Sequence, residues 1–169
     1  MQRRLRIVLL GVTAMVVGGA IWVYAQQRAA EPRMLSAQDY VEIQQLYGYY
    51  TRDVDPGSPR DASWLFAADG SFESPNGQKY RGQQQLKEFY EQLRKRQSFG
   101  IRHINSNFLL HATPEGAEGT AYMIQVERRD ASKPIAVTIF GVYHDTFVKT
   151  PAGWRFKDRA FKTDGPLGQ

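Results

Sequence analysis

The stretch Gly82–Arg129, which reads GQQQLKEFYEQLRKRQSFGIRHINSNFLLHATPEGAEGTAYMIQVERR, changes its hydrophobic period at Gly100. Before that glycine, apolar side chains recur at the spacing of an amphipathic helix, which predicts a helix over 82–96. After it, apolar and polar residues alternate, which predicts strands over 101–111 and 120–129. A helix followed by consecutive strands is typical of α+β domains, in which the helices cover one side of an antiparallel sheet.

The C-terminal part of the chain continues the same pattern. Residues 134–149 and 154–161 predict two further strands, and the segments 113–116 and 151–153 carry the Pro and Gly residues of turns. Strands joined by short turns predict an antiparallel meander.

The residues before Gly82 predict two helices and a hairpin. Ser36 and Asp39 have the spacing of a capping box, so a helix begins there, and it ends at Asp55-Pro56-Gly57. Ser58-Pro59 has the character of an N-cap and first position of a second helix, and Asn76-Gly77 is a strong hairpin turn signal. We therefore expect an α+β fold in which a curved antiparallel sheet wraps around the helices and encloses a conical cavity.

Length and composition limit the classes to which the protein can belong. The 169 residues suit one domain, and the net charge of +5 falls to +2 once Arg3, Arg4 and Arg6 are set aside. That small balance excludes a strongly basic nucleic-acid binder. The absence of cysteine excludes disulfides, thiol nucleophiles and Cys-ligated metals. With only three histidines, we expect neither a metal site nor a cofactor.

The N-terminus is basic and then apolar. Residues 1–6 carry the three arginines, and residues 7–25 form an uncharged run close to the length that crosses a bilayer. Two interpretations stay open. Val23-Tyr24-Ala25 resembles the cleavage site of a signal peptide, whereas Trp22 and Tyr24 would suit the interfacial belt of an uncleaved anchor. Either one predicts a body outside the cytoplasm, periplasmic or secreted.

The expected organisation is a signal peptide or membrane anchor over 1–25, a linker over 26–35, one domain over 36–163 and a tail over 164–169.

Several short motifs follow one another in a distinctive order between Leu35 and Thr163. They are YTRDVDPGSPRDASWLFAAD at 50–69, Arg81-Gly82, Arg102-His103 followed by Asn107, Gly141 with Tyr143 and Asp145, and Gly153-Trp154-Arg155-Phe156 followed by Arg159. In this order and spacing, the chain resembles the nuclear transport factor 2-like superfamily. Within it, the chain is similar to the SnoaL-like branch, which includes scytalone dehydratase and shares the fold of ketosteroid isomerase.

The resemblance implies a pocket in which an aspartate orients a histidine that transfers protons. The positions that match the motif are Asp55 and His103, which become the expected catalytic pair. A carboxylate bound to one ring nitrogen fixes the tautomer of the imidazole and raises the basicity of the other nitrogen. Such a base can remove a proton next to a carbonyl, and the result is dehydration or isomerisation.

Four more residues are expected to bind the substrate. They are Tyr47, Tyr50, Tyr122 and Asn107, of which the tyrosines would donate hydrogen bonds to a developing oxyanion.

Two features depart from the dehydratase pattern. Scytalone dehydratase has a second histidine on the next strand, where this chain has Tyr122, a much weaker acid. Asp53 lies in the same loop as Asp55, so either carboxylate can be the pocket residue. Asp55 before Pro56-Gly57 also matches an Asx turn, and His103 also suits a core position. The other two histidines are expected at a solvated strand end (His111) and on the outer face (His144).

Three classes of function fit these residues. The first is a cofactor-free lyase or isomerase that acts on a small hydrophobic or cyclic carbonyl compound. The second is a non-catalytic pocket for such a ligand, and the third is a protein–protein scaffold on the outer side of a membrane. We also expect a homodimer, because the strand over 134–149 carries apolar residues on both faces and family members commonly pair the outer faces of their sheets.

Overall fold

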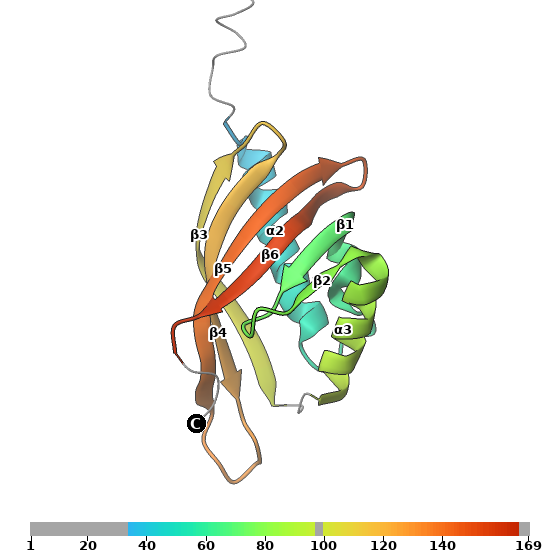
Figure 1. Cartoon of the computed structure of the whole chain (residues 1–169). Coiled ribbons are helices and arrows are strands. Elements are labelled where there is room, and N and C mark those ends of the chain that lie inside the picture. The colour runs from blue at the N-terminus through green and yellow to red at the C-terminus, as the bar shows by residue number, and fades with distance from the viewer. Residues whose placement is uncertain (1–33, 97–99, 166–169) are drawn as a thin grey trace, which may run out of the picture. The chain divides into compact units, whose positions relative to one another are not determined.

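The computed structural model describes residues 34–96 and 100–165. The chain divides into a unit of residues 1–33 and a unit of residues 34–169, and Figure 1 shows the second as a curved sheet with helices on one side. The expected signal peptide or anchor over 1–25 and most of the linker over 26–35 lie outside the described residues. Within the described part, none of the helices has the length and apolar character needed to cross a bilayer.

Helix α2 (Ala37–Val54) begins where the capping box predicts. The Ser36 side chain accepts a hydrogen bond from the Asp39 backbone, and the Asp39 side chain accepts one from the Ser36 backbone in return. The helix ends at Asp55, where Pro56 prevents its continuation. Its buried face packs against the sheet, while Val41 is exposed.

The second predicted helix is much shorter than expected. Instead of beginning at Ser58-Pro59, it is one turn of 3-10 helix, η1 (Ala62–Leu65), capped by the side chain of Asp61. The Ser58 hydroxyl accepts a hydrogen bond from the Arg60 backbone N–H, as an N-cap does, and donates to the Asp53 carboxylate, but no helix follows it. The prediction of a second α-helix from Ser58-Pro59 was therefore wrong, and Phe66 already belongs to the sheet.

Six strands form one sheet. Their bounds are β1 (Phe66–Glu73), β2 (Lys79–Arg81), β3 (Ile101–Ala112), β4 (Ala117–Glu127), β5 (Ala136–Thr150) and β6 (Gly153–Thr163). The spatial order is β2-β1-β6-β5-β4-β3, and all neighbours are antiparallel except β1 and β6, which run parallel. The predicted α+β class with a curved sheet around helices is thus confirmed, with one parallel pair that the meander pattern did not predict.

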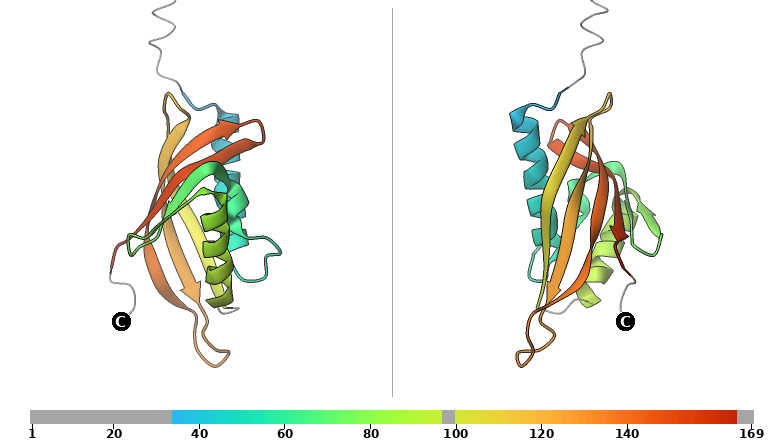
Figure 2. Two further views of the ribbon diagram at one scale, coloured as in Figure 1. Left: turned by 45° about the vertical axis from the view of Figure 1, so that its right-hand side comes forward. Right: turned by 90° about the vertical axis from the view of Figure 1, so that its left-hand side faces the viewer.

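The two long helices lie against the concave side of this sheet. Helix α2 packs on β3 and β6, and helix α3 (Gly82–Arg96) packs on β1 (Figure 2). The predicted bounds of α3 are confirmed. Between the helices and the sheet lies an aromatic core in which Tyr47 and Tyr50 each contact Phe156 edge to face.

A bulge in β3 decides which residues of that strand face the core. Asn107 has a φ of 53°, and the register between β3 and β4 shifts between Ser106 and Leu109. The extra residue changes the alternation, so that His103 and Asn105 face inward before the bulge and Phe108 faces inward after it. Asparagine tolerates this left-handed backbone better than most residues.

Candidate active site

Asp55 and His103 are brought together by the end of α2 and the start of β3. Asp55 is the residue that ends the helix, and its backbone N–H donates to the Thr51 carbonyl at 2.9 Å. One oxygen of its side chain, Oδ1, lies 2.7 Å from His103 Nδ1 and accepts a second hydrogen bond from the His103 backbone N–H at 3.0 Å. The expected contact between the two residues is present, whereas its role in proton transfer stays a prediction.

This geometry defines the chemical state of the imidazole. A carboxylate only accepts hydrogen bonds, so Nδ1 carries the proton, and in the neutral ring Nε2 is left with a free lone pair. Because Nδ1 faces Asp55, Nε2 points away from it. The two side chains are well shielded, with 8% of the His103 side chain and 12% of the Asp55 side chain exposed. Such an arrangement can act as a general base through Nε2.

The neighbouring carboxylate of Asp53 serves a different contact. It accepts hydrogen bonds from the Ser58 hydroxyl and from the Trp64 indole N–H, each at 2.7 Å. Arg60 also lies 3.9 Å from it. Asp53 therefore ties the loop after α2 to η1, and Asp55 is the carboxylate that reaches His103.

The two tyrosines expected to hold substrate lie in the core instead. Tyr47 and Tyr50 are both almost completely buried. The Tyr47 hydroxyl donates to the Asp145 carboxylate, and the Tyr50 hydroxyl accepts a hydrogen bond from Tyr90 at 3.2 Å. Burial raises the pKa of Tyr47 well above its ordinary value, and the charge of Asp145 raises it further. These phenols keep their protons at neutral pH and are engaged with protein groups.

Around these tyrosines, the structure contains a buried ion pair that the sequence interpretation missed. Arg159 Nε lies 3.0 Å from Asp145 Oδ1, and both side chains are fully buried. The guanidinium also lies over four aromatic rings, 3.7 Å from the centroid of Tyr143 and 4.0 Å from that of Tyr50. Burial raises the pKa of Asp145 and the charge of Arg159 opposes that shift.

A signal for this pair was available in the sequence. Asp145 shares the inward face of a predicted strand with Tyr143 and Phe147. A charged residue on such an apolar face indicates a buried partner of opposite charge.

The other two expected substrate residues lie away from the pair. Tyr122 is 53% exposed and lies on the outer face of β4, whereas His103 lies on the inner face of β3. Tyr122 cannot share an inner pocket with His103, because neighbouring residues of a strand point to opposite faces and the two strands pair in register. Asn107 is exposed at the bulge, and its left-handed backbone conformation forms part of that bulge. Tyr122 therefore does not share an inner pocket with His103, and a substrate-binding role for Asn107 stays a prediction.

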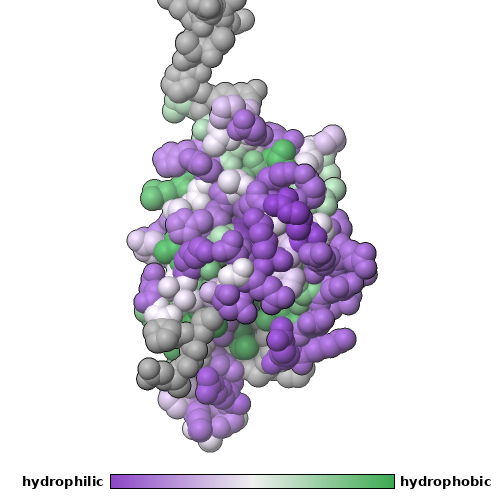
Figure 3. Space-filling model, viewed as in Figure 1, coloured by the Kyte–Doolittle hydropathy of each residue, from purple (hydrophilic) through white to green (hydrophobic). Residues whose placement is uncertain are grey.

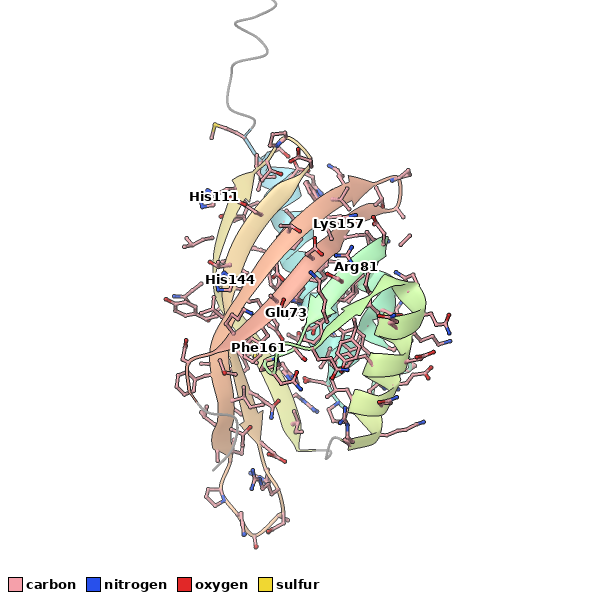
Figure 4. All side chains as sticks on the ribbon, viewed as in Figure 1. Glu73, Arg81, His111, His144, Lys157 and Phe161 are labelled. Atoms are coloured by element: carbon pink, nitrogen blue, oxygen red, sulfur yellow. The ribbon has the colours of Figure 1, made fainter. Side chains whose placement is uncertain are left out.

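Two hollows on the described surface are relevant to these residues. One, of about 500 Å³, adjoins Asp55 and is lined by the loop 56–60 together with Tyr49, Arg52 and Arg102. The other, of about 470 Å³, is a groove on the outer face of the sheet, with Glu73, His111 and His144 in its lining (Figure 4). The surface in Figure 3 is mostly hydrophilic on this side, with smaller apolar areas between charged residues.

The outer groove is separate from the Asp55–His103 pair, and His111 and His144 are exposed as expected. Within residues 34–96 and 100–165, no three acidic or histidine side chains are grouped so that they could hold a metal ion.

Comparison with known sequences identifies the family. The profile of the SnoaL-like domain matches residues 35–160, which is most of the chain and nearly all of the residues that the structure describes. The chain belongs to the SnoaL-like family. No curated protein is similar enough in sequence to count as a match.

Solved structures with a similar fold agree with the assignment. A protein of unknown function with a cystatin-like fold from Nostoc punctiforme is 22% identical, with a TM-score of 0.69, and the match covers 80% of this chain and 98% of that one. A proposed scytalone dehydratase from Novosphingobium aromaticivorans is 22% identical, with a TM-score of 0.65 and coverage of 78% and 88%. At this identity, the likeness shows the shared fold alone.

A third similar structure is a proposed aromatic ring hydroxylase from Novosphingobium aromaticivorans. It is 22% identical to this SnoaL-like protein, with a TM-score of 0.67, and the match covers 79% of this chain and 94% of that one. The fold is thus similar to that of proteins with different names, so the chemistry must be argued from the site of this chain.

Proposed function

We propose that this SnoaL-like protein is a cofactor-free lyase or isomerase in which His103 transfers protons and Asp55 orients it. The observation that carries the proposal is the pair of hydrogen bonds from His103 to one oxygen of Asp55. Together they hold the imidazole in one orientation and one tautomer, which is the requirement for a general base with a fixed direction of attack. A proposed scytalone dehydratase has a similar fold, so the fold is compatible with this class of reaction.

The reaction fits a small cyclic ketone that carries a hydroxyl group on the β carbon. His103 Nε2 takes the proton from the carbon between the carbonyl and the hydroxyl-bearing carbon, and the freed electron pair forms an enolate. When the enolate collapses, its electrons form the carbon–carbon double bond and the β carbon–oxygen bond breaks. The proton held on Nε2 then joins the leaving hydroxide as water, and the neutral imidazole is restored. Asp55 remains a carboxylate throughout and stabilises the imidazolium in between.

The proposed setting is outside the cytoplasm. The basic residues 1–6 followed by the uncharged run 7–25 support export, with or without cleavage of that segment. The final state is either a secreted or periplasmic protein or one held by a single N-terminal helix.

A homodimer through the outer face of the sheet completes the proposal. Ile104, Ile124 and Phe140 are direct neighbours across β3, β4 and β5, and between 37% and 51% of each is exposed. Tyr122, 53% exposed, extends this apolar row. A contiguous exposed apolar patch on a sheet is typical of a protein interface. A second copy of this chain is the occupant that the family resemblance favours.

The experiment uses the full-length chain and β-hydroxy-α-tetralone, which loses water to give α-naphthol. Formation of α-naphthol is followed by its absorbance for the wild type and for His103→Gln. We expect catalysed dehydration by the wild type and a loss of about 10²–10⁴-fold in kcat/KM for His103→Gln, the usual contribution of a general base.

His111→Gln is the matched control, because His111 lies exposed on the same strand and forms part of the outer groove. It should dehydrate the compound at the wild-type rate. Thermal melts of both variants separate loss of chemistry from loss of folding. Equal rates for His103→Gln and the wild type would contradict the proposal.

A further inference from the structure

Asn105 lies beside His103 on the inner face of the sheet. The two residues are separated by one residue of β3, before the bulge, so their side chains leave the same face of the strand. Across the sheet, the neighbours of Asn105 are Met123 on β4 and then Gly141 on β5. Met123 is a flexible thioether that can move to admit a ligand, whereas the space over Gly141 is taken by the backbone of Lys162 on β6.

The side-chain amide of Asn105 is buried without a partner. Both its nitrogen and its oxygen are inaccessible to solvent, and neither makes a hydrogen bond with any of the residues that the structure describes. Native proteins rarely leave both ends of a buried amide unpaired, because each group then loses its hydrogen bonds to water without replacement. An unpaired buried group in a native protein therefore needs an explanation, and a role toward a bound molecule is one of them.

The row around Asn105 contrasts with the ionic core nearby. The Tyr47 hydroxyl and Arg159 Nη2 donate to Asp145, while Arg159 Nη1 is buried without a hydrogen-bond partner among the described residues. Gln125, which pairs with His103 across β3 and β4, donates to the Thr138 hydroxyl at 2.9 Å. Asn105 is thus the next polar side chain after His103 on the inner face of β3, and its hydrogen-bonding groups are unused.

We propose that Asn105 binds the oxygen substituents of the substrate and holds its acidic carbon at His103 Nε2. This inference rests on the proposed function, since it assigns the substrate class of the same site. The NH₂ group donates to a carbonyl or enolate oxygen, and the amide oxygen accepts from a hydroxyl group. A neutral amide between apolar neighbours selects an uncharged hydroxy-ketone or an enol and disfavours carboxylates and phosphates, which need a cationic partner when buried.

The experiment compares Asn105→Leu with the wild type in the full-length chain. Leucine has nearly the same shape as asparagine and removes both hydrogen-bonding groups. Two quantities are measured: the dissociation constant for α-naphthol, from its fluorescence, and kcat/KM for β-hydroxy-α-tetralone. We expect both to worsen by about tenfold, the worth of one good hydrogen bond. The melting temperature should stay the same or rise, because a buried unpaired amide has been removed.

Ser106→Ala is the matched control, since Ser106 is the next residue of β3 and faces the outer side. It should leave both constants unchanged. Asn105→Ala serves as a second variant in case leucine does not fit, with the same expected direction for affinity and turnover.

The outcomes separate this inference from the proposed function. Weaker α-naphthol binding by Asn105→Leu supports the assignment of Asn105, whether or not the wild type dehydrates the ketone. A wild type that binds α-naphthol but does not dehydrate the ketone would contradict only the proposed reaction. Normal binding and turnover by a folded Asn105→Leu would overturn the assignment and leave the reaction intact. If the wild type binds neither compound, the substrate class assigned here is wrong.

Discussion

A single oxygen of Asp55 accepts hydrogen bonds from both the backbone and the ring of His103, at 3.0 Å and 2.7 Å. The backbone contact holds the carboxylate against β3, and the ring contact then fixes the imidazole relative to the same strand. Because Asp55 is also the residue that ends α2, the position of the histidine is coupled to the end of that helix. The pair is thus built from the junction of two rigid elements, which suits a site that needs a fixed geometry.

Asp55→Asn tests the charge of the pair while keeping its shape. The asparagine oxygen can still accept both hydrogen bonds, so folding should change little. The imidazolium formed during proton transfer would lose its counter-charge, and we expect kcat/KM to fall by about 10²-fold or more. The measurement is dehydration of β-hydroxy-α-tetralone, with Asp69→Asn as the control, since Asp69 is an exposed carboxylate of β1. An Asp55→Asn protein as active as the control would exclude an electrostatic role for Asp55.

Removing one partner of the Asp145–Arg159 ion pair should strongly destabilise the core. Asp145→Leu leaves a buried guanidinium without its counter-charge, and we expect the free energy of unfolding to fall by about 3–5 kcal/mol. The double variant Asp145→Leu, Arg159→Met should recover much of that loss, because two apolar side chains replace both charges. Urea denaturation of the single and double variants gives the comparison. A single variant as stable as the wild type would contradict this account of the core.

Asp39 makes the stability depend on pH. Its hydrogen bonds with Lys149 and Ser36 lower the pKa of its carboxyl group well below the ordinary value, against the opposing effect of burial, and Trp154 also donates to it. A carboxyl whose pKa is lower in the folded state stabilises the fold above its unfolded pKa of about 3.9, and the contribution is lost as the pH falls from there toward the folded pKa.

Asp39→Asn should therefore lower the free energy of unfolding by about 1–2 kcal/mol at neutral pH, and the difference from the wild type should shrink below about pH 4. Denaturant titrations at a series of pH values measure this, with Glu115→Gln in an exposed turn as the control. A difference that grows as the pH falls would have the wrong sign.

Substitutions of Asn107 test whether its backbone conformation or its side chain is the feature that matters. At a φ of 53°, Asn107→Val forces a β-branched residue into the left-handed region, and we expect a loss of about 1–3 kcal/mol in unfolding free energy. Asn107→Gly adopts this φ freely and should retain both stability and turnover. If Asn107→Gly is stable but inactive, the side chain of Asn107 binds substrate after all.

The exposed row of Ile104, Ile124 and Phe140 predicts a dimer that one charge can disrupt. Sedimentation at micromolar concentration should show a dimer for the wild type and a monomer for Ile124→Lys, because the lysine cannot be desolvated at the centre of the interface. Val41→Lys, on the exposed side of α2, should remain dimeric. A monomeric wild type would refute the proposed interface.

Much of the fold was predictable because its signals are local. The capping box at Ser36 and Asp39 sets the start of α2, the period of three to four residues gives α3, and the turn at Asn76-Gly77 joins β1 to β2. The parallel pairing of β1 with β6 was not predictable, since the two segments are far apart in sequence. Period and turn signals report on neighbours along the chain and carry no information about such a contact.

The site was predictable only in part for the same reason. Asp55 and His103 matched a family pattern, and that pattern identified the residues that meet. Tyr122 was placed in the pocket by alignment, yet the alternation of β4 puts it on the outer face. Asn105 gave no signal in the sequence, because an unpaired amide becomes visible only when every neighbour of its side chain is known.

The most direct test of the dyad is a double-mutant cycle on kcat/KM for β-hydroxy-α-tetralone, with wild type, His103→Gln, Asp55→Asn and the double variant. If Asp55 acts through His103, the double variant should be about as slow as His103→Gln alone, because residues that work as a unit share one effect. Losses that multiply, so that the double variant falls below His103→Gln by the full Asp55→Asn factor, would contradict a dyad.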